Sequence, residues 1–360
     1  MSVFNKKYRS LFYLTFYLTA ALQAGPSLAA GAAGQAFNPD ISVNFLGLFQ
    51  QGNRMSQDRA DSNHKGFTFQ EGELQFTSDV DPYFRASALF SISPKKTEFG
   101  IDPEEVYFES ISLPVVTIRA GKFKAAFGKH NQLHTHAFPF IDQPLVSKDL
   151  LGDEGINEAG VSAAALLPTK WFSEFTIQAF SNSNDTVFKS ANSGDMAGVA
   201  NLKNLWDLSD DHTLEFSIFG AQGRNQYEST TRAFGSDLIL KWRPSVGGKY
   251  KAVIWQTEYL SGNIQNSPNG PSGLSGIATW LQYQFAERWW AQTRFDYEGL
   301  PHAVGRNDKC RQSALLGFFP SEFSGFRLQY DHLKTQNLPD DHRVAFQWNI
   351  SIGAHPAHAY

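Results

Sequence analysis

The clearest pattern in the chain is an alternation of apolar and polar residues near its carboxyl end. Between residues 343 and 352 the odd positions are polar or small, and the even positions are Val344, Phe346, Trp348, Ile350 and Ile352. Successive side chains of a β-strand point to opposite faces, so this segment predicts a strand with one apolar face. Shorter stretches of the same alternation occur at 326–331, 291–297 and 214–218.

Sixteen segments of this kind follow one another along the chain. They begin near residues 40, 66, 83, 104, 115, 156, 171, 197, 213, 234, 250, 275, 288, 311, 325 and 342. The connections are alternately short, as at 81–82 and 168–170, and long, as at 93–103 and 126–155. This asymmetry is typical of bacterial outer-membrane barrels. The pattern predicts an all-β fold, a 16-stranded antiparallel transmembrane outer-membrane β-barrel. The alternative, a soluble β-sandwich, would expose too much apolar surface to water.

The amino terminus has the layout of a secretory signal peptide. Lys6, Lys7 and Arg9 precede an apolar run at 11–22 and then small residues. We expect residues 1–29 to be a signal peptide, with cleavage as late as residue 36 as the other option, and residues 37–360 to form one barrel domain. A membrane anchor is the alternative, but the apolar run is shorter than the ~20 residues of a spanning helix. With a first strand near residue 40, we expect neither a plug domain nor interaction with TonB.

Composition supports an exported barrel and excludes several function classes. The chain has 31 Phe, 12 Tyr and 8 Trp, yet its mean hydropathy is −0.33, because apolar and polar faces cancel in the average. Cys310 is the only cysteine, which excludes a disulfide framework and a cysteine-based zinc site. The net charge of −4 gives no indication of nucleic acid binding. Without a nucleophile elbow or a phosphate-binding loop, we expect no enzyme activity.

Several short motifs resemble one family of porins. The stretch RAGKFKAAFG (119–128) is similar to a strand end of phosphate-selective porins of the O/P type. The segments 37–42, 80–84, 105–109, 134–138, 142–146 and 353–360 resemble, within that family, the group called zinc-regulated TonB-dependent outer membrane receptors. The resemblance implies a pore in the outer membrane of a Gram-negative cell, assembled as a homotrimer. We expect Phe346, Trp348, Ile350 and the terminal Tyr360 to form its assembly signal.

Strand parity predicts which charges line the lumen. If the even positions of the last strand face lipid, the inward acids are Glu71, Glu73, Glu105, Glu109, Glu174, Glu215, Asp237, Glu258, Asp296 and Asp331. The inward bases are Arg85, Arg119, Lys241, Arg243, Arg294, Arg327 and Arg343. Acids dominate the early strands and bases the late ones, which predicts a transverse field with weak selectivity or a slight cation preference. The other interpretation is that these charges only solvate the interior. By parity Lys122 and Lys124 point outward, unless a bulge re-aims them.

The connection at 126–155 is the third long loop. Phe138, Phe140, Ile141 and Leu150 make it too apolar to lie in water, so we expect it to fold inward and narrow the pore, as the third loop of porins does. A short helix is expected at 145–151.

Three histidines in this loop, His130, His134 and His136, leave two interpretations open. With Asp142 they would form a metal site, because zinc takes imidazole and carboxylate ligands. Otherwise they are constriction residues that titrate near neutral pH or donate to lumen carboxylates. We expect no resident cofactor, and at most transient zinc binding.

Three hypotheses on function follow. The first is a passive porin for small hydrophilic solutes or ions. The second is a zinc uptake channel or metal-responsive receptor that uses the histidine loop. The third is a barrel enzyme or surface-binding protein whose loops carry the function.

Overall fold

The computed structural model describes residues 39–57, 64–94, 99–184, 186–246, 250–264, 272–300 and 307–353. The signal peptide and Tyr360 lie outside these residues. No helix in the described ranges is long and apolar enough to cross a membrane.

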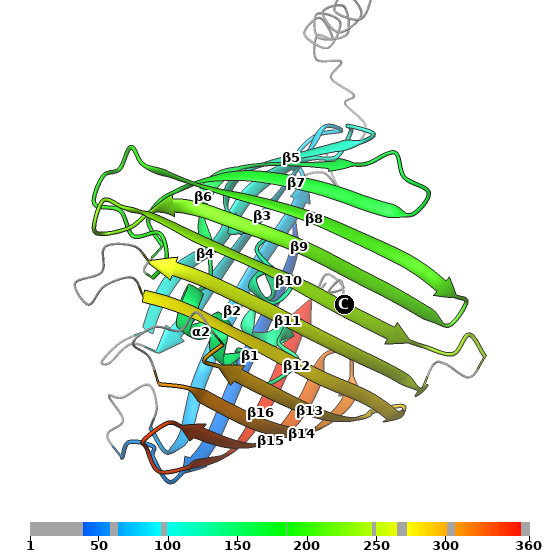
Figure 1. The fold of residues 1–360 in the computed structure, drawn as a ribbon. Coiled ribbons are helices and arrows are strands. Elements are labelled where there is room, and N and C mark those ends of the chain that lie inside the picture. Colours follow the sequence, from blue (N-terminus) through cyan, green and yellow to red (C-terminus); the bar gives the residue numbers. More distant parts are fainter. Residues whose placement is uncertain are drawn as a thin grey trace, which may run out of the picture. The chain divides into compact units, whose positions relative to one another are not determined.

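The sixteen strands of the described chain close into one antiparallel barrel, in which β1 pairs with β16 (Figure 1). Their bounds are β1 (Asp40–Gly52), β2 (Gly66–Asp79), β3 (Phe84–Pro94), β4 (Phe99–Ser110), β5 (Val116–Lys124), β6 (Asn157–Leu166), β7 (Phe172–Ser181), β8 (Met196–Ser209), β9 (His212–Arg224), β10 (Thr230–Trp242), β11 (Ala252–Ile264), β12 (Ser272–Ala286), β13 (Trp289–Glu298), β14 (Lys309–Ser321), β15 (Ser324–Thr335) and β16 (Asp341–Gly353). The predicted fold class is confirmed, because each predicted segment corresponds to one of these strands.

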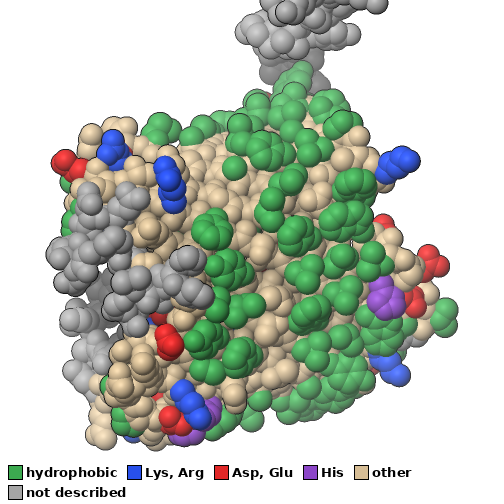
Figure 2. Space-filling view, in the orientation of Figure 1, with side chains coloured by type: hydrophobic (Ala, Val, Ile, Leu, Met, Phe, Trp, Pro, Cys, Tyr) green, Lys and Arg blue, Asp and Glu red, His purple; other side chains and the backbone are tan. Residues whose placement is uncertain are grey.

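The outer wall is apolar. Large side chains that alternate with lumen-facing residues are exposed on it, among them Phe45, Phe175, Trp255 and Leu328. Figure 2 shows hydrophobic side chains across the middle of the visible wall, with charged groups gathered towards the two rims. Phe346 and Ile350 of the predicted assembly signal lie on the same outward face. Such a wall suits a barrel that is surrounded by lipid.

The predicted long loop at 93–103 is wrong, because β4 already begins at Phe99. The alternation was missed because it changes phase inside this strand. Glu105 pairs with Leu89 while Pro103 pairs with Phe90, so Glu104 is the extra residue of a β-bulge. Phe99 and Ile101 point outward before the bulge, and Val106 and Phe108 do so after it. At the bulge, both Glu104 and Glu105 point into the lumen.

Residues 125–156, which we call the constriction loop, fold into the barrel as predicted. The loop contains two 3₁₀ turns, η1 (His130–Gln132) and η2 (Thr135–Ala137), and the helix α2 (Leu145–Leu151), whose bounds are the predicted ones. The base of the loop is closed by a backbone hydrogen bond from Ala125 to Ile156 at 2.8 Å. Apolar packing holds it against the wall, since Phe140 and Ile141 are buried with Leu48, Ala278, Trp280, Leu315 and Ala345.

The wall makes room for α2 with glycines. A Cβ atom on Gly276 of β12 would lie 2.8 Å from Cβ of Val146, and one on Gly262 of β11 would lie 2.4 Å from Leu150 Cδ1. Both separations are shorter than van der Waals contact. The short helix therefore rests directly on the backbone of these two strands.

Candidate functional site

The carboxylate of Asp142 joins the constriction loop to the late strands. Its Oδ1 accepts from Arg294 Nη2 at 2.8 Å, and its Oδ2 accepts from Arg311 Nη1 at 2.6 Å and from Arg343 Nη2 at 2.7 Å. Gln329 Nε2 donates to Oδ1 at 2.9 Å. Burial disfavours the charge on Asp142, but Arg311, Arg294 and Arg343 outweigh it and hold the pKa of Asp142 well below its usual range. Asp142 is therefore an anionic anchor of the loop.

Two acids of the wall complete this arginine cluster. Asp296 Oδ2 lies 2.9 Å from Arg311 Nε and 3.0 Å from Arg294 Nε, and Asp331 Oδ2 accepts from Arg343 at 2.6 Å. Arg327 donates to the carbonyl of Phe138 in the loop. Four residues that parity assigned to the lumen belong to this cluster, namely Arg294, Asp296, Arg327 and Arg343. Their role is to hold the loop, and each has a partner in it or in the wall.

On the opposite side, His134 bridges two carboxylates of β4. Its Nδ1 lies 2.9 Å from Glu104 Oε1 and its Nε2 lies 3.0 Å from Glu105 Oε2. Burial lowers the pKa of His134, but the hydrogen bonds to Glu104 and Glu105 outweigh this and raise the pKa to about 10. A histidine with a carboxylate at each ring nitrogen is a cation at neutral pH. It anchors the loop by charge, as Asp142 does on the other side.

His136 and Thr135 extend this second anchor to β2. His136 Nδ1 forms an ion pair with Glu73, and Thr135 hydrogen-bonds to Glu71. Both acids were predicted to face the lumen, and here they meet the loop.

His130 lies apart from the two carboxylate anchors. Its ring packs on Phe138, with 4.5 Å between the centroids, and its ring nitrogens have no hydrogen-bond partner among the described residues. Burial lowers the pKa of His130 to about 3, so the ring is neutral. The structure thus separates the predicted four-residue set: His130 is in an apolar contact, His134 and His136 pair with wall acids, and Asp142 pairs with arginines.

One triad at the loop has donor atoms close enough to be considered for a metal. Atoms of Glu73, Glu104 and His134 lie within 4.8 Å of one another. A metal requires a neutral imidazole with a free lone pair, however, and His134 is held as a cation between Glu104 and Glu105. These contacts favour the interpretation of His134 as a donor to lumen carboxylates.

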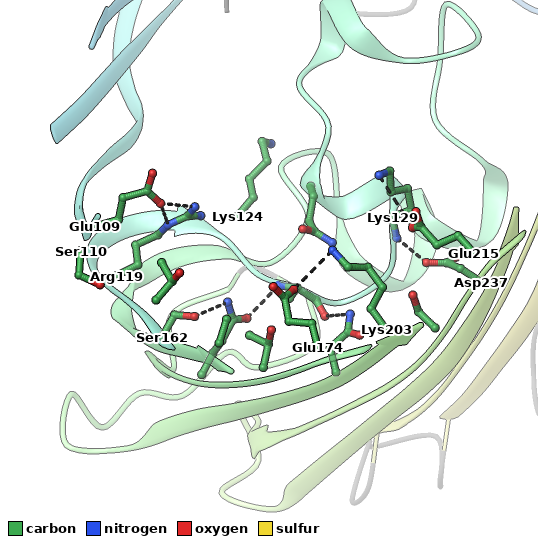
Figure 3. Close-up of a pocket in the computed structure, with 18 of the residues that line it drawn as sticks. Glu109, Ser110, Arg119, Lys124, Lys129, Ser162, Glu174, Lys203, Glu215 and Asp237 are labelled. Carbon is green, nitrogen blue, oxygen red and sulfur yellow. Dashed lines mark hydrogen bonds and ion pairs between the residues drawn. The ribbon is translucent and has the colours of Figure 1, made fainter. Parts of the chain in front are cut away.

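A cavity of about 500 Å³ remains between the loop and the wall from β4 to β10 (Figure 3). Its charged lining residues are Glu109, Arg119, Lys124, Lys129, Glu174, Lys203, Glu215 and Asp237. Four are basic and four acidic, and polar Ser, Thr, Asn and Gln side chains fill most of the remaining surface. None of the three loop histidines is among the residues that line this cavity.

The charges of the cavity lie in pairs across neighbouring strands. Arg119 Nη2 is 2.8 Å from Glu109 Oε2, and Lys203 Nζ is 3.4 Å from Glu174 Oε1. From the loop, Lys129 places its Nζ 3.9 Å from Glu215 Oε1 and its backbone N–H 2.6 Å from Asp237 Oδ2. Such pairing leaves a polar surface with little net charge.

Other predicted lumen charges lie towards the short-turn rim. Arg85 pairs with Asp79 at 2.7 Å, and Arg243 follows the end of β10, where its backbone N–H donates to Asp211. Lys241, one residue before the end of β10, is half-buried. Glu258, by contrast, is buried in the middle of β11, where it accepts from Ser147 of the constriction loop at 3.4 Å.

Sequence reasoning missed or misplaced several residues of the site. Lys124, expected to point outward by parity, is buried in the lumen with its Nζ 3.0 Å from Glu104, because β5 ends there and the chain turns inward. Lys122 is half-buried and donates to the Pro103 carbonyl at 2.8 Å. Arg311 was overlooked although its parity is inward, since it stands near the start of its strand. Glu104 was hidden by the bulge.

Comparisons with known proteins agree with this architecture. No protein-family model matches the chain. An uncharacterized protein of Aquifex aeolicus is 26% identical over 388 aligned positions, which cover 91% of this chain and 81% of that protein. Pseudomonas putida OprB superposes with a TM-score of 0.63 at 6% identity, covering 91% of this chain and 96% of its own.

The anion-selective porin from Comamonas acidovorans gives a TM-score of 0.62 at 9% identity, covering 88% of this chain and 99% of that one. The chain has the porin fold. The outer membrane channel DcaP of Acinetobacter baumannii gives a TM-score of 0.57 at 12% identity, with 88% and 96% covered. At these identities the likeness is one of fold.

Proposed function

We propose that the chain is an outer-membrane porin, a passive and weakly selective channel for small hydrophilic solutes or ions. The observation that carries this proposal is the polar cavity beside the constriction loop, whose four basic and four acidic residues balance. A pore with paired charges attracts neither sign strongly, whereas selectivity needs a ring of like charge. The solved structures named as an anion-selective porin and an outer membrane channel support a channel on the same fold.

We also propose that the protein is exported, lies in the outer membrane and forms a trimer. The amino-terminal leader directs export, the apolar wall places the barrel in the outer membrane, and three copies assemble into a trimer. A trimer form is recorded for Vibrio cholerae OmpT, which has the same fold, with a TM-score of 0.57.

The test is planar-bilayer recording of the purified mature protein in asymmetric potassium chloride. We expect stepwise conductance and a reversal potential close to zero. Absence of conductance would contradict a channel, and a reversal potential close to the ideal anion value would contradict weak selectivity.

Zinc uptake through the histidine loop has less support. The contacts of His134 and His136 with carboxylates occupy the groups that such a path would need. Replacing His130, His134 and His136 with Ala should leave the ratio of zinc to potassium permeability unchanged. A specific loss of zinc permeability in that variant would favour the metal channel instead.

A further inference from the structure

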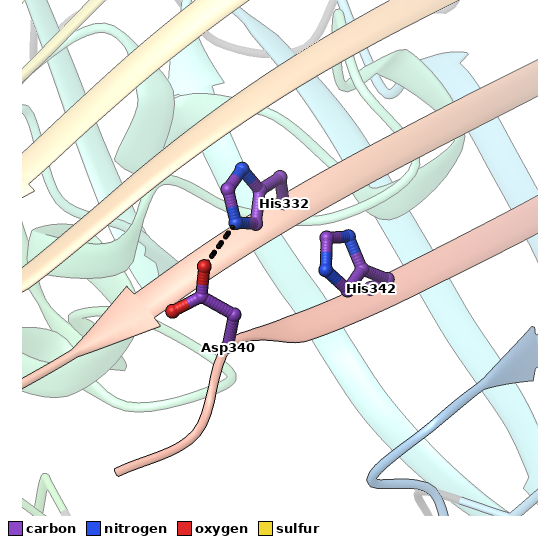
Figure 4. Close-up of side chains that lie close together, drawn as sticks. All are labelled: His332, Asp340 and His342. Atoms are coloured by element: carbon purple, nitrogen blue, oxygen red, sulfur yellow. Dashed lines mark hydrogen bonds and ion pairs between the residues drawn. The ribbon is translucent and has the colours of Figure 1, made fainter.

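A second cluster of metal-ligating side chains lies at the long-loop end of β15 and β16, outside the lumen. His332 and His342 are cross-strand partners, and their rings stack with centroids 4.6 Å apart and planes 9° apart. Asp340 precedes β16, and its Oδ2 lies 2.8 Å from His332 Nε2 (Figure 4). The strand neighbours Asp331 and Arg343 point inward, so the two histidines point away from the pore.

The donor set fits a divalent transition metal. Two imidazole nitrogens and one carboxylate oxygen, one from each residue, lie within 4.8 Å of one another. Zinc, copper and nickel favour imidazole with carboxylate ligands, and ligand atoms at bonds of about 2.1 Å stand about 3.4 Å apart in a tetrahedron. Rotation of the side chains can bring the donor atoms from within 4.8 Å to about 3.4 Å of one another. Asp340 and His342 are both exposed, Asp340 in the loop just before β16 and His342 near the start of β16.

We propose that His332, Asp340 and His342 bind one divalent transition metal ion, with the remaining coordination position open to water. The site belongs to the rim of the barrel and does not depend on whether the lumen conducts.

Neighbouring residues hold the ligands in place, as the outer shell of a metal site does. Tyr330 OH lies 2.8 Å from His342 Nδ1, which leaves Nε2 of that ring for the metal. Asn53 holds the backbone of residues 340–342 at both ends. Its Nδ2 donates to Asp340 O at 2.9 Å, and its Oδ1 accepts from His342 N at 2.7 Å.

One cation competes for the carboxylate. Lys334 Nζ is 3.9 Å from Asp340 Oδ2, and its side chain is 61% exposed. A flexible, exposed ammonium group at this distance contributes little and can swing into solvent when a metal binds.

The experiment uses the untagged mature protein in detergent and zinc chloride in equilibrium dialysis. The wild type should bind one more zinc ion, at micromolar free zinc, than the His332→Ala/His342→Ala variant. Asp340→Asn should weaken that site by tenfold or more. His212→Ala is the matched control, because His212 is an exposed histidine whose contact is Ser209 at the other rim; it should bind as the wild type does.

Copper(II) provides a readout of the ligands themselves. Electron paramagnetic resonance of the copper-loaded wild type should show coupling to two imidazole nitrogens, and each single histidine variant should show one fewer. Equal zinc stoichiometry in the wild type and the double variant, or a copper spectrum that the variants do not change, would overturn the proposal. Because the three residues lie outside the lumen, conductance without metal should be the same in all variants, which confirms that they are folded.

Discussion

At the scale of single residues, opposite charges fix the constriction loop to opposite parts of the wall. Asp142 brings a negative charge to the arginines of β13, β14 and β16, and His134 brings a positive charge to two glutamates of β4. Each anchor has its countercharges in the wall. The lumen charges nearest the loop therefore define its position.

Replacing Asp142 with Asn should loosen the loop. Arg294, Arg311 and Arg343 would lose their shared carboxylate, and breaking a buried ion pair costs about 3–5 kcal/mol, or about 2–3 kcal/mol here because Arg343 is partly exposed. We expect a lower melting temperature and a larger, noisier conductance in bilayer recordings. Asp153→Asn is the control, since its pair with Lys148 in the same loop is exposed. Equal conductance in the two variants would contradict the anchor.

The raised pKa of His134 predicts how stability depends on pH. The folded value of about 10 exceeds the unfolded value of about 6.5, so the contribution of His134 is fully present below about pH 6.5 and is lost as pH rises towards 10. The stability difference between the wild type and His134→Gln should shrink over this window in thermal unfolding. A difference that stays constant between pH 6.5 and 10 would show that the His134 pKa is not raised.

The pKa values of His134 and His130 also predict how conductance depends on pH. A titratable histidine filter predicts a change between about pH 5 and 7. His134 remains charged and His130 remains neutral across that range, since their pKa values are about 10 and about 3. Neither ring is therefore expected to alter conductance there.

At the scale of elements, the sequence predicted the strands well because burial on one face repeats every two residues. The prediction failed where the period breaks. The bulge at Glu104 is a matter of register with β3, which a single strand does not display. The chain turns inward where β5 ends, so parity gave the wrong direction for Lys124. The partners of His134 lie on a strand about thirty residues earlier in the chain, and no local pattern encodes such contacts.

The seating of α2 is testable through its glycines. Gly262→Val should push Leu150 away from the wall, because the three nearest atoms to a Cβ at this position all belong to Leu150, and overpacking of this kind costs about 1–3 kcal/mol. We expect faster proteolysis of the constriction loop and a less stable barrel. Gly198→Ala on β8 is the control, because the nearest atom to its added Cβ is 3.9 Å away. Similar proteolysis of both variants would argue against close contact between helix and strand.

At the scale of the whole molecule, the weak selectivity that we propose would follow from the pairing of charges around the cavity. Replacing Lys129 and Lys203 with Gln leaves Glu215 and Glu174 without their cations. The permeability ratio of potassium to chloride should rise several-fold, measured as a shift in reversal potential. Lys148→Gln, an exposed pair partner of Asp153, should leave the ratio as it is. No shift in the double variant would place the solute path elsewhere.

The constriction loop contacts residues that lie far from it in the sequence, and this has a consequence for assembly of the barrel. Ile141 meets Gln329, 188 positions along the chain, and Asp142 meets Arg343, 201 positions along. Contacts between such distant segments form late, because the intervening chain must first be brought together. The constriction loop therefore cannot make all of its contacts with the wall before the last strand is in place. An assembly intermediate that lacks β15 and β16 would leave the constriction loop without its contacts to Arg327, Gln329 and Arg343, so the loop would not be held against that part of the wall.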